Sequence, residues 1–274
     1  HRDLHSFPTR RSSDLKIFTA AAALDSGVVT PNTTFDCEGT WQGPGTKIKC
    51  LKRSGHGEIS LFDGIRLSCN IALSQTALKL GLDGFYSYAK AFHLEDPFEL
   101  PCASSKGMLP DRLKATEADL AEMGFGQGRL LVSPLWIALM AGTVTNNGQM
   151  MRPYLISKIT GQNGKMISET SPLSWGQPVS SQAASEITRM MVATVDTGTG
   201  TVARLPGVAV AGKTGTAENP EGRPHGWFVA TAPAGRPVVA VAAIVENSGT
   251  GSANAGPIVK QILRQALKQA GELD

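Results

Sequence analysis

The hydrophobic period of the chain changes from helical to strand-like in its second half, and this change limits the folds available to it. Three strand-like segments follow one another at residues 207–216, 226–232 and 238–246, with connections short enough for antiparallel neighbours. Helical periodicity occupies residues 16–24, 61–67, 71–80, 85–92, 133–144, 183–195 and 257–270. The pattern predicts an α+β fold, with an antiparallel sheet flanked by helices and a helical subdomain in the first half.

Turn chemistry divides the remaining segments. Residues 28–57 are rich in Gly, Pro and Thr and are expected to form a loop region, and residues 94–113 are Pro-rich and irregular. A Gly-Gln-Asn-Gly turn at residues 161–164 predicts a β-hairpin. No apolar run reaches the roughly 18 residues that a membrane span needs.

The first fifteen residues differ from the rest. Residues 1–15 contain three Arg, show neither a helical stripe nor strand alternation, and join abruptly onto a strong helical pattern at Lys16. They resemble a translated sequencing adapter, so we interpret residues 1–15 as non-native and residues 16–274 as an N-terminally truncated domain. The alternative is a genuine basic, flexible N-terminus. Without a signal peptide or a start methionine, the chain is expected to be a fragment of a longer protein.

Composition excludes several classes of protein. Of the 274 residues, 41% are hydrophobic and 18% are charged, which is typical of a folded protein and not of a disordered chain or a collagen. The formal net charge of +3 is too small and too scattered to indicate a nucleic-acid partner.

Three short motifs carry chemistry, and they stand in a fixed order. Ser13 and Lys16 form S-x-x-K, Ser68 and Asn70 form S-x-N, and K-T-G-T begins at Lys213. Because residues i and i+3 share one face of a helix, Ser13 and Lys16 can touch, and a lysine in a dry site can lose its proton and act as a base. K-T-G on a strand would place an ammonium group and hydroxyls beside a substrate carboxylate. Each residue alone is better explained as a cap, a turn or a solvated strand end, but the ordered set indicates a nucleophilic site.

With these motifs the chain resembles the transpeptidase domain of penicillin-binding proteins. Further similar segments are Gly-His-Gly-Glu at 55–58, Gly-Phe-Gly-Gln-Gly at 124–128, Gly-Thr-Gly-Thr at 198–201 and His-Gly-Trp-Phe at 225–228. Within the family the chain is most similar to the elongation-type class B enzymes, which are like penicillin-binding protein 2. The resemblance implies a β-lactamase/transpeptidase-like fold and D,D-transpeptidation of peptidoglycan stem peptides through a serine acyl-enzyme, which β-lactams also acylate.

The resemblance also implies partners and a location. Stem peptides and β-lactams would be the ligands, with no nucleic acid and no cofactor for catalysis. The full-length protein would be anchored in the bacterial inner membrane, act at its periplasmic face and belong to a cell-wall elongation complex.

The resemblance assigns catalytic roles to the matching positions. Ser13 would be the nucleophile and Lys16 its base. Ser68 would relay a proton to the leaving D-Ala amine, and Asn70 would hydrogen-bond the substrate amide and Lys16. Lys213 would set the electrostatic potential of the pocket.

Substrate contacts are implied at the K-T-G-T motif. Thr214 and Thr216 would contact the terminal carboxylate, and Gly215 would let the substrate backbone lie close to the strand. The backbone N–H groups of Ser13 and Thr216 would form the oxyanion hole.

The sequence before Lys16 departs from the family pattern. Pro-Gly usually precedes the serine, but Arg-Arg-Ser stands here at residues 10–12, and Asp14 adds a carboxylate that would favour a protonated Lys16. We expect Ser13 at the helix start near Lys16, Ser68 and Lys213, loose packing of residues 1–11, and poor acylation of the chain as written.

Three other functions share these motifs. A serine β-lactamase needs a base for the deacylating water, but the chain has no Glu in an E-x-x-L-N context, and Cys69 stands where class A β-lactamases carry Asp. A β-lactam-sensing receptor domain would acylate once and signal, and an inactive truncated fragment would not react.

Four side chains form a candidate metal site. Cys37, Cys50, His56 and Cys69 have the spacing C-x12-C-x5-H-x12-C, and three thiols with one imidazole suit tetrahedral zinc. The resemblance adds that elongation-type enzymes can carry metal ligands in the loop before the G-H-G motif and inside S-x-N. The alternatives are a Cys37–Cys50 disulfide or four unconnected side chains, and Cys102 is expected to lie apart.

Overall fold

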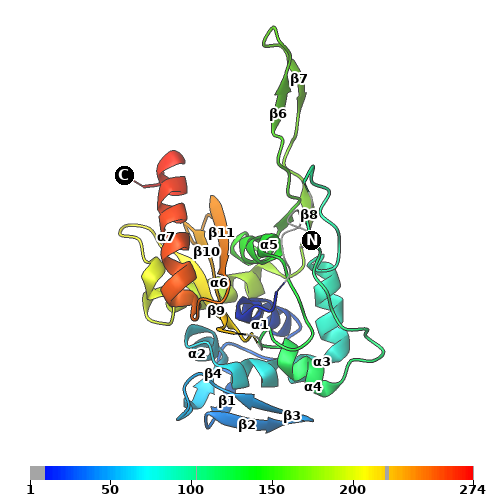
Figure 1. Ribbon diagram of the computed structural model, residues 1–274, viewed down its shortest axis with the longest axis vertical. Helices are drawn as coiled ribbons and strands as arrows, with labels where there is room; N and C mark the ends of the chain where they lie inside the picture. Colours follow the sequence, from blue (N-terminus) through cyan, green and yellow to red (C-terminus); the bar gives the residue numbers. More distant parts are fainter. Residues whose placement is uncertain (1–9, 103, 220–221, 274) are drawn as a thin grey trace.

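A three-stranded antiparallel sheet forms one half of the protein. The computed structural model describes residues 10–102, 104–219 and 222–273 (Figure 1). The sheet has the order β11–β10–β9, with β9 at Ala211–Ala217, β10 at His225–Ala232 and β11 at Val239–Val245. All three predicted strands are confirmed, although β9 begins four residues later than residue 207.

Helices cover both faces of this sheet. Helix α7 (Gly251–Gln269) packs on one face, and α5 (Pro134–Thr145) and α6 (Ser181–Asp196) pack on the other (Figure 1). Side chains of β10 alternate accordingly, because successive residues of a strand point to opposite faces. Phe228 and Ala230 join the core under α7, whereas Trp227 and Val229 join the larger core.

Helix α7 starts six residues before the predicted position. Pro257 looks like a first-turn residue, which is where proline fits a helix best. In the structure it lies inside the helix, and the small residues from Gly251 to Gly256 supply the turns before it.

The helical subdomain surrounds α1 (Lys16–Asp25). This Ala-rich helix is buried from Lys16 to Ala23, because its small side chains let neighbouring elements approach on every side. Phe18 packs edge-on against Phe85, Phe92 and Trp136, at ring-centroid distances of 5.1, 5.4 and 6.1 Å. The other helices are α2 (Leu61–Arg66), α3 (Asn70–Ala91) and α4 (Glu117–Met123).

One predicted break between helices is confirmed, and one helix was missed. The two helices predicted at 71–80 and 85–92 are confirmed as the two parts of α3, which is interrupted at Gly81, where φ is 75° and ψ is 163°. Helix α4 was not predicted; a reciprocal capping box between Thr116 and Asp119 starts it.

The loop expected at residues 28–57 is wrong in part, because this region contains three short strands and the first residue of a fourth. β1 (Thr34–Cys37) pairs with β4 (Gly57–Ser60), and β2 (Thr40–Gly43) pairs with β3 (Thr46–Lys49). Each strand has only four residues, so the alternation is too short to detect in the sequence. A side chain at Gly55 would overlap the carbonyl group of Cys37, which explains why this turn needs glycine.

The predicted hairpin is confirmed as β6 (Lys158–Thr160) and β7 (Met166–Glu169), which projects far from the body (Figure 1). Strands β5 (Met150–Met151) and β8 (Ser174–Gly176) pair at its base, and the short 3-10 helices η1 (Ser13–Leu15) and η2 (Thr201–Ala203) complete the list. Among the described residues, no helix combines the length and apolar character needed to cross a bilayer.

Candidate active site

Ser13 lies at the start of the α1 region, as expected. Ser12 caps η1, and the Oγ of Ser13 donates a hydrogen bond of 2.9 Å to the carbonyl oxygen of Thr216 on β9. The side chain is nearly buried, with 6% of the residue exposed. This contact brings the first and third motifs together across 203 positions of sequence.

The expected loose packing of residues 1–11 is wrong at Arg10, whereas residues 1–9 lie outside the described part of the chain. The backbone N–H and C=O of Arg10 both pair with Val132 at 2.9 Å. Its guanidinium also forms an ion pair of 2.8 Å with Glu246. These contacts fix the chain just before the candidate nucleophile.

Lys16 is the first residue of α1 and is almost fully buried. Its Nζ lies 5.8 Å from the ring centroid of Phe125, and no hydrogen bond from it is formed among the described residues. Burial lowers the pKa of Lys16 to about 8, against the opposing effect of the Asp14 carboxylate. A lysine in this state can release its proton near neutral pH.

Lys213 is fully buried, so the interpretation as a solvated strand end is wrong. Its Nζ donates hydrogen bonds of 2.8 Å to the Oγ of Ser68 and to the carbonyl oxygen of Thr214. Ser68 reaches this position from a tight turn in which its φ is 58°. Burial and the nearby charge of Lys16 hold the pKa of Lys213 well below its usual value.

The expected hydrogen bond between Asn70 and Lys16 does not form within the described structure. Asn70 is the first residue of α3, and its Nδ2 donates a bond of 2.9 Å to the carbonyl oxygen of Lys49. The side chain therefore links the S-x-N motif to the end of β3, next to Cys50 in sequence.

The backbone of Thr216 faces Ser13. Because the N–H and C=O of a strand residue point to the same side, the Thr216 N–H also faces the serine whose hydroxyl binds its carbonyl. Gly215 leaves no room for a side chain, since a Cβ would lie 2.8 Å from that of Trp227 and 3.0 Å from both carboxylate oxygens of Asp14.

Asp14 is a buried acid without a full set of partners. Its Oδ2 accepts a bond of 3.2 Å from Ser12, while Oδ1 has no hydrogen-bond partner. Burial raises the pKa of Asp14 to about 7, although the charges of Lys213 and Lys16 oppose the shift. The expectation that a carboxylate enters the site next to the lysines is therefore met by geometry.

Two further residues at the site were not assigned from the sequence. Gln127 donates from Nε2 to the Thr216 carbonyl at 3.4 Å, and the hydroxyl oxygens of Thr199 and Thr214 lie 2.7 Å apart. The only signal was that both lie in segments similar to the family, 124–128 and 198–201, without a role attached.

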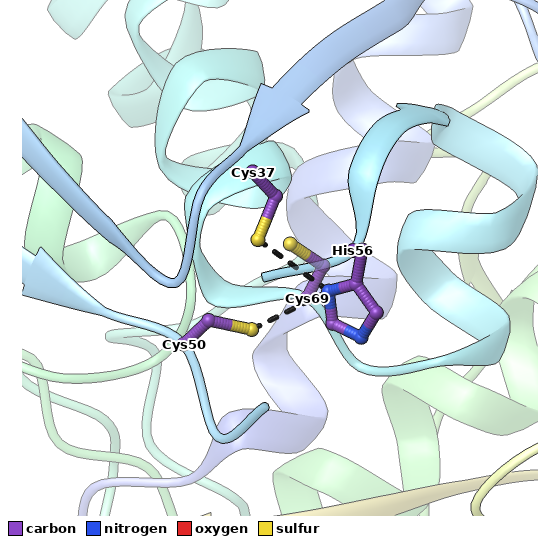
Figure 2. A group of neighbouring side chains, drawn as sticks. All are labelled: Cys37, Cys50, His56 and Cys69. Carbon is purple, nitrogen blue, oxygen red and sulfur yellow. Dashed lines mark hydrogen bonds between the residues drawn. The ribbon is translucent and has the colours of Figure 1, made fainter. Parts of the chain in front are cut away.

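The candidate metal ligands converge, and Figure 2 shows their sulfur atoms and imidazole turned toward one another. Cys37, Cys50, His56 and Cys69 place their ligand atoms within 4.8 Å of one another. The Nδ1 of His56 lies 3.4 Å from the sulfur of Cys37 and 3.5 Å from that of Cys50. All four cysteines are free thiols, and Cys102 is exposed.

The two nitrogen–sulfur distances match those of a tetrahedral zinc site. Zinc bonds of about 2.3 Å to sulfur and about 2.0 Å to nitrogen put neighbouring sulfur and nitrogen ligands about 3.5 Å apart. A hydrogen bond with Cys69 is the main cause that lowers the pKa of the Cys50 thiol to about 5. The same bond and burial raise the pKa of Cys69.

Comparison with known proteins identifies the family. The model of the penicillin binding protein transpeptidase domain matches residues 12–264. The chain belongs to this family. Curated relatives of this penicillin-binding protein domain include the peptidoglycan D,D-transpeptidase PbpA of Mycobacterium tuberculosis, 35% identical over 278 residues, covering 93% of this chain and 54% of the relative. The peptidoglycan D,D-transpeptidase MrdA of Haemophilus influenzae is 28% identical over 289 residues, covering 94% and 44%.

Solved transpeptidase structures share the fold. The D,D-transpeptidase domain of a peptidoglycan glycosyltransferase from Eggerthella lenta superimposes with a TM-score of 0.92 at 28% identity, covering 99% of this chain and 68% of that one. Penicillin-binding protein A of M. tuberculosis, as a ceftriaxone acyl-enzyme, gives 0.89 at 33% identity, with coverages of 96% and 62%. The predicted α+β transpeptidase fold is confirmed. The chain spans about half the length of the curated relatives it matches.

Proposed function

We propose that this domain is a serine D,D-transpeptidase that cross-links peptidoglycan stem peptides and is acylated by β-lactams. The observation that carries the proposal is the meeting of three motifs at one point. Ser13 binds the backbone of Thr216, and Lys213 binds Ser68, so nucleophile, relay and cation surround one position. The relatives named peptidoglycan D,D-transpeptidases and the acyl-enzyme structures support the same chemistry.

The reaction follows from these positions. Lys16 takes the proton of the Ser13 hydroxyl as Oγ attacks the carbonyl carbon of the penultimate D-Ala, and the N–H groups of Ser13 and Thr216 bind the developing oxyanion. The C–N bond then breaks, and Ser68 passes a proton to the departing D-Ala amine. An acceptor amine attacks the ester, forms the new amide and returns the Ser13 hydroxyl.

The test is an adduct on the serine. Incubation with benzylpenicillin followed by mass spectrometry should show one acyl group on Ser13 and none in Ser13→Ala. The adduct should be slow in the chain as written and fast once residues 1–15 are replaced by a native sequence with a serine at position 13. An adduct on another residue would contradict the proposal.

Rapid turnover of a chromogenic cephalosporin would instead indicate a β-lactamase. We propose a transpeptidase because Cys69 occupies the position at which class A β-lactamases carry Asp, and its sulfur caps α3 by accepting from the N–H of Ala72 at 3.5 Å. Stoichiometric labelling without turnover is therefore expected.

We propose that residues 1–15 are not native to this domain. The support is the misfit of Asp14, whose Oδ1 is buried without a partner beside Gly215. Sequencing the genomic region upstream of the codon for Lys16 tests this directly. Recovery of the same fifteen residues from the genome would contradict it.

We also propose that the whole protein is membrane-anchored at the periplasmic face and serves cell-wall elongation. The support is the sequence similarity to elongation-type enzymes, together with the relative MrdA. Complementation of a strain lacking its elongation transpeptidase, with the native upstream sequence restored, should recover cell shape. Rescue of division alone would contradict this assignment.

A structural zinc is proposed at Cys37, Cys50, His56 and Cys69, separate from catalysis. The metal would tie β1 and the end of β3 to the start of α3, where Ser68 and Asn70 lie. Elemental analysis should find one zinc per chain, lost in Cys50→Ser and retained in the matched control Cys102→Ser. A zinc-free protein with one Cys37–Cys50 disulfide would contradict the proposal.

A further inference from the structure

The segment after α6 is held tightly against the end of α2. The N–H of Thr199 donates to the carbonyl oxygen of Arg66 at 3.3 Å, and Nη1 of Arg66 donates to the carbonyl oxygen of Thr197, also at 3.3 Å. Gly198 lies so close to the Arg66 carbonyl that a Cβ there would overlap it. The backbone therefore fixes where Thr199 stands.

From this position Thr199 meets the K-T-G motif. Its Oγ1 lies 2.7 Å from the Oγ1 of Thr214, which is 7% exposed on β9. Two hydroxyl groups carry two hydrogens, and the bond between them uses only one. No other acceptor for either hydroxyl occurs in the described part of the chain, so the pair retains one hydrogen for a ligand.

The neighbouring charge favours an anionic ligand. Lys213 precedes Thr214, and its ammonium has three hydrogens, of which two go to Ser68 and to the Thr214 carbonyl. A carboxylate accepts hydrogen bonds and donates none, so it matches the remaining hydroxyl hydrogen, and the buried ammonium of Lys213 beside the pair attracts its charge.

We infer that Thr199 is a positioning residue that determines specificity for a terminal carboxylate. By bonding to Thr214, it orients the hydroxyl pair so that one hydrogen points to the carboxylate of a D-Ala terminus or a β-lactam. This inference rests on the proposed function and adds to it a residue outside the three motifs.

An orienting role and a purely structural role of Thr199 have different consequences for ligand binding. If Thr199 only held the segment after α6 in place, its loss would lower stability and weaken every ligand equally. If it orients the carboxylate contact, its loss weakens ligands that carry a carboxylate and spares their esters.

The experiment compares two ligands at equilibrium. In a Ser13→Ala background, which prevents covalent reaction, binding of benzylpenicillin and of its methyl ester is measured by NMR titration. Thr199→Val should weaken benzylpenicillin about tenfold, equivalent to about 1.4 kcal/mol, and leave the ester within about twofold. Thr199→Ser should restore the preference, and Thr197→Val, in the same segment but exposed, should change neither ligand.

Each other outcome overturns the inference. An unchanged preference in Thr199→Val would remove the role, and equal weakening of both ligands with a lower melting temperature would make the role structural. If the Ser13→Ala protein bound benzylpenicillin and its methyl ester equally well, the proposed contact between the hydroxyl pair and the ligand carboxylate would be overturned. The transpeptidase proposal is tested separately by the adduct on Ser13, so the two can fail independently.

Discussion

Removing the charge of Asp14 should accelerate acylation at neutral pH. The carboxylate is fully buried next to the nucleophile and favours the protonated form of Lys16, whose pKa is about 8. At that pKa only about one tenth of the Lys16 side chains are neutral at pH 7. Asp14→Asn keeps the shape and removes the charge, so the pKa of Lys16 should fall.

The size of the effect follows from simple electrostatics. Where the effective dielectric constant is about 20, one unit charge changes the energy of another about 8 Å away by about 2 kcal/mol. A fall of about one pKa unit is within this range and raises the neutral fraction of Lys16 at pH 7 to about one half. Because the pKa of Asp14 is about 7, only half of the molecules carry its charge at pH 7, and we expect a gain of about twofold.

Because Asp14 also acts on Lys213, the rate constant of acylation must be measured separately from the dissociation constant of the non-covalent penicillin complex. The same carboxylate favours the ammonium form of Lys213, so Asp14→Asn should also weaken the non-covalent binding of penicillin. Acylation should therefore be followed by rapid-quench mass spectrometry over a range of benzylpenicillin concentrations, from pH 5.5 to 9.5. The first-order rate constant of acylation should rise at pH 7. In its pH profile, the decline on the acid side should move to lower pH.

A matched control is Asp36→Asn, which removes an exposed carboxylate on β1 and should leave both constants unchanged. The predicted effect of Asp14 would be refuted if Asp14→Asn left the first-order rate constant of acylation, and the acid side of its pH profile, unchanged from the parent chain. It would also be refuted if the constant fell.

Two further predictions concern the buried charges. Lys213→Met should lower penicillin labelling by at least about a hundredfold, because the carboxylate loses its ammonium partner and Ser68 loses its hydrogen-bond donor. Circular dichroism checks that the variant folds. Normal labelling of the folded variant would contradict the role of Lys213 in the site. Urea unfolding should show stability falling by about 4 kcal/mol as the pH rises from about 4 to 7, because the folded state holds the Asp14 proton with a pKa of about 7 against 3.8 for the free acid. Stability should rise again between pH 8 and 10.5, where only the unfolded chain still protonates Lys16. Asp14→Asn should remove the fall in stability between about pH 4 and 7 and keep the rise between about pH 8 and 10.5. If the stability of the parent chain did not vary with pH, both predictions would be contradicted.

The sequence predicted the elements whose patterns are long enough to repeat. The strands of the sheet and the helices at α1, α5 and α6 appear where periodicity places them. The four-residue strands between β1 and β4 do not, because their pairing is decided by turns and by partners distant in sequence. The interruption of α3 at Gly81 was predictable, because the helical periodicity ends at residue 80 and resumes at residue 85.

The site was predictable as a set of motifs but not as a set of contacts. Order and spacing indicated Ser13, Lys16 and Lys213, since each motif is local. Gln127 and Thr199 act through hydrogen bonds to residues 89 and 15 positions away, and no local pattern encodes such pairs. The burial of Lys213 was also hidden, because lysine is rarely buried unless it has partners.

The partners of the two buried lysines indicate which one serves as the base. Both cannot easily keep their charge in one dry site, since burial and mutual repulsion disfavour two ammonium groups. The Lys213 ammonium donates to two oxygen acceptors, and hydrogen bonds to a charged group contribute about 1.5–3 kcal/mol each. Among the described residues the Lys16 ammonium donates no hydrogen bond and contacts the ring of Phe125, which is worth about 0.5–2 kcal/mol, while the charge of Asp14 favours the ammonium form of both lysines. Although burial and Lys16 lower the pKa of Lys213, its two acceptors hold the ammonium form, so the proton is lost more easily from Lys16. A neutral amine then stands at the start of α1, directly after the 3-10 helix of Ser13, and a cation on the strand that faces the substrate carboxylate.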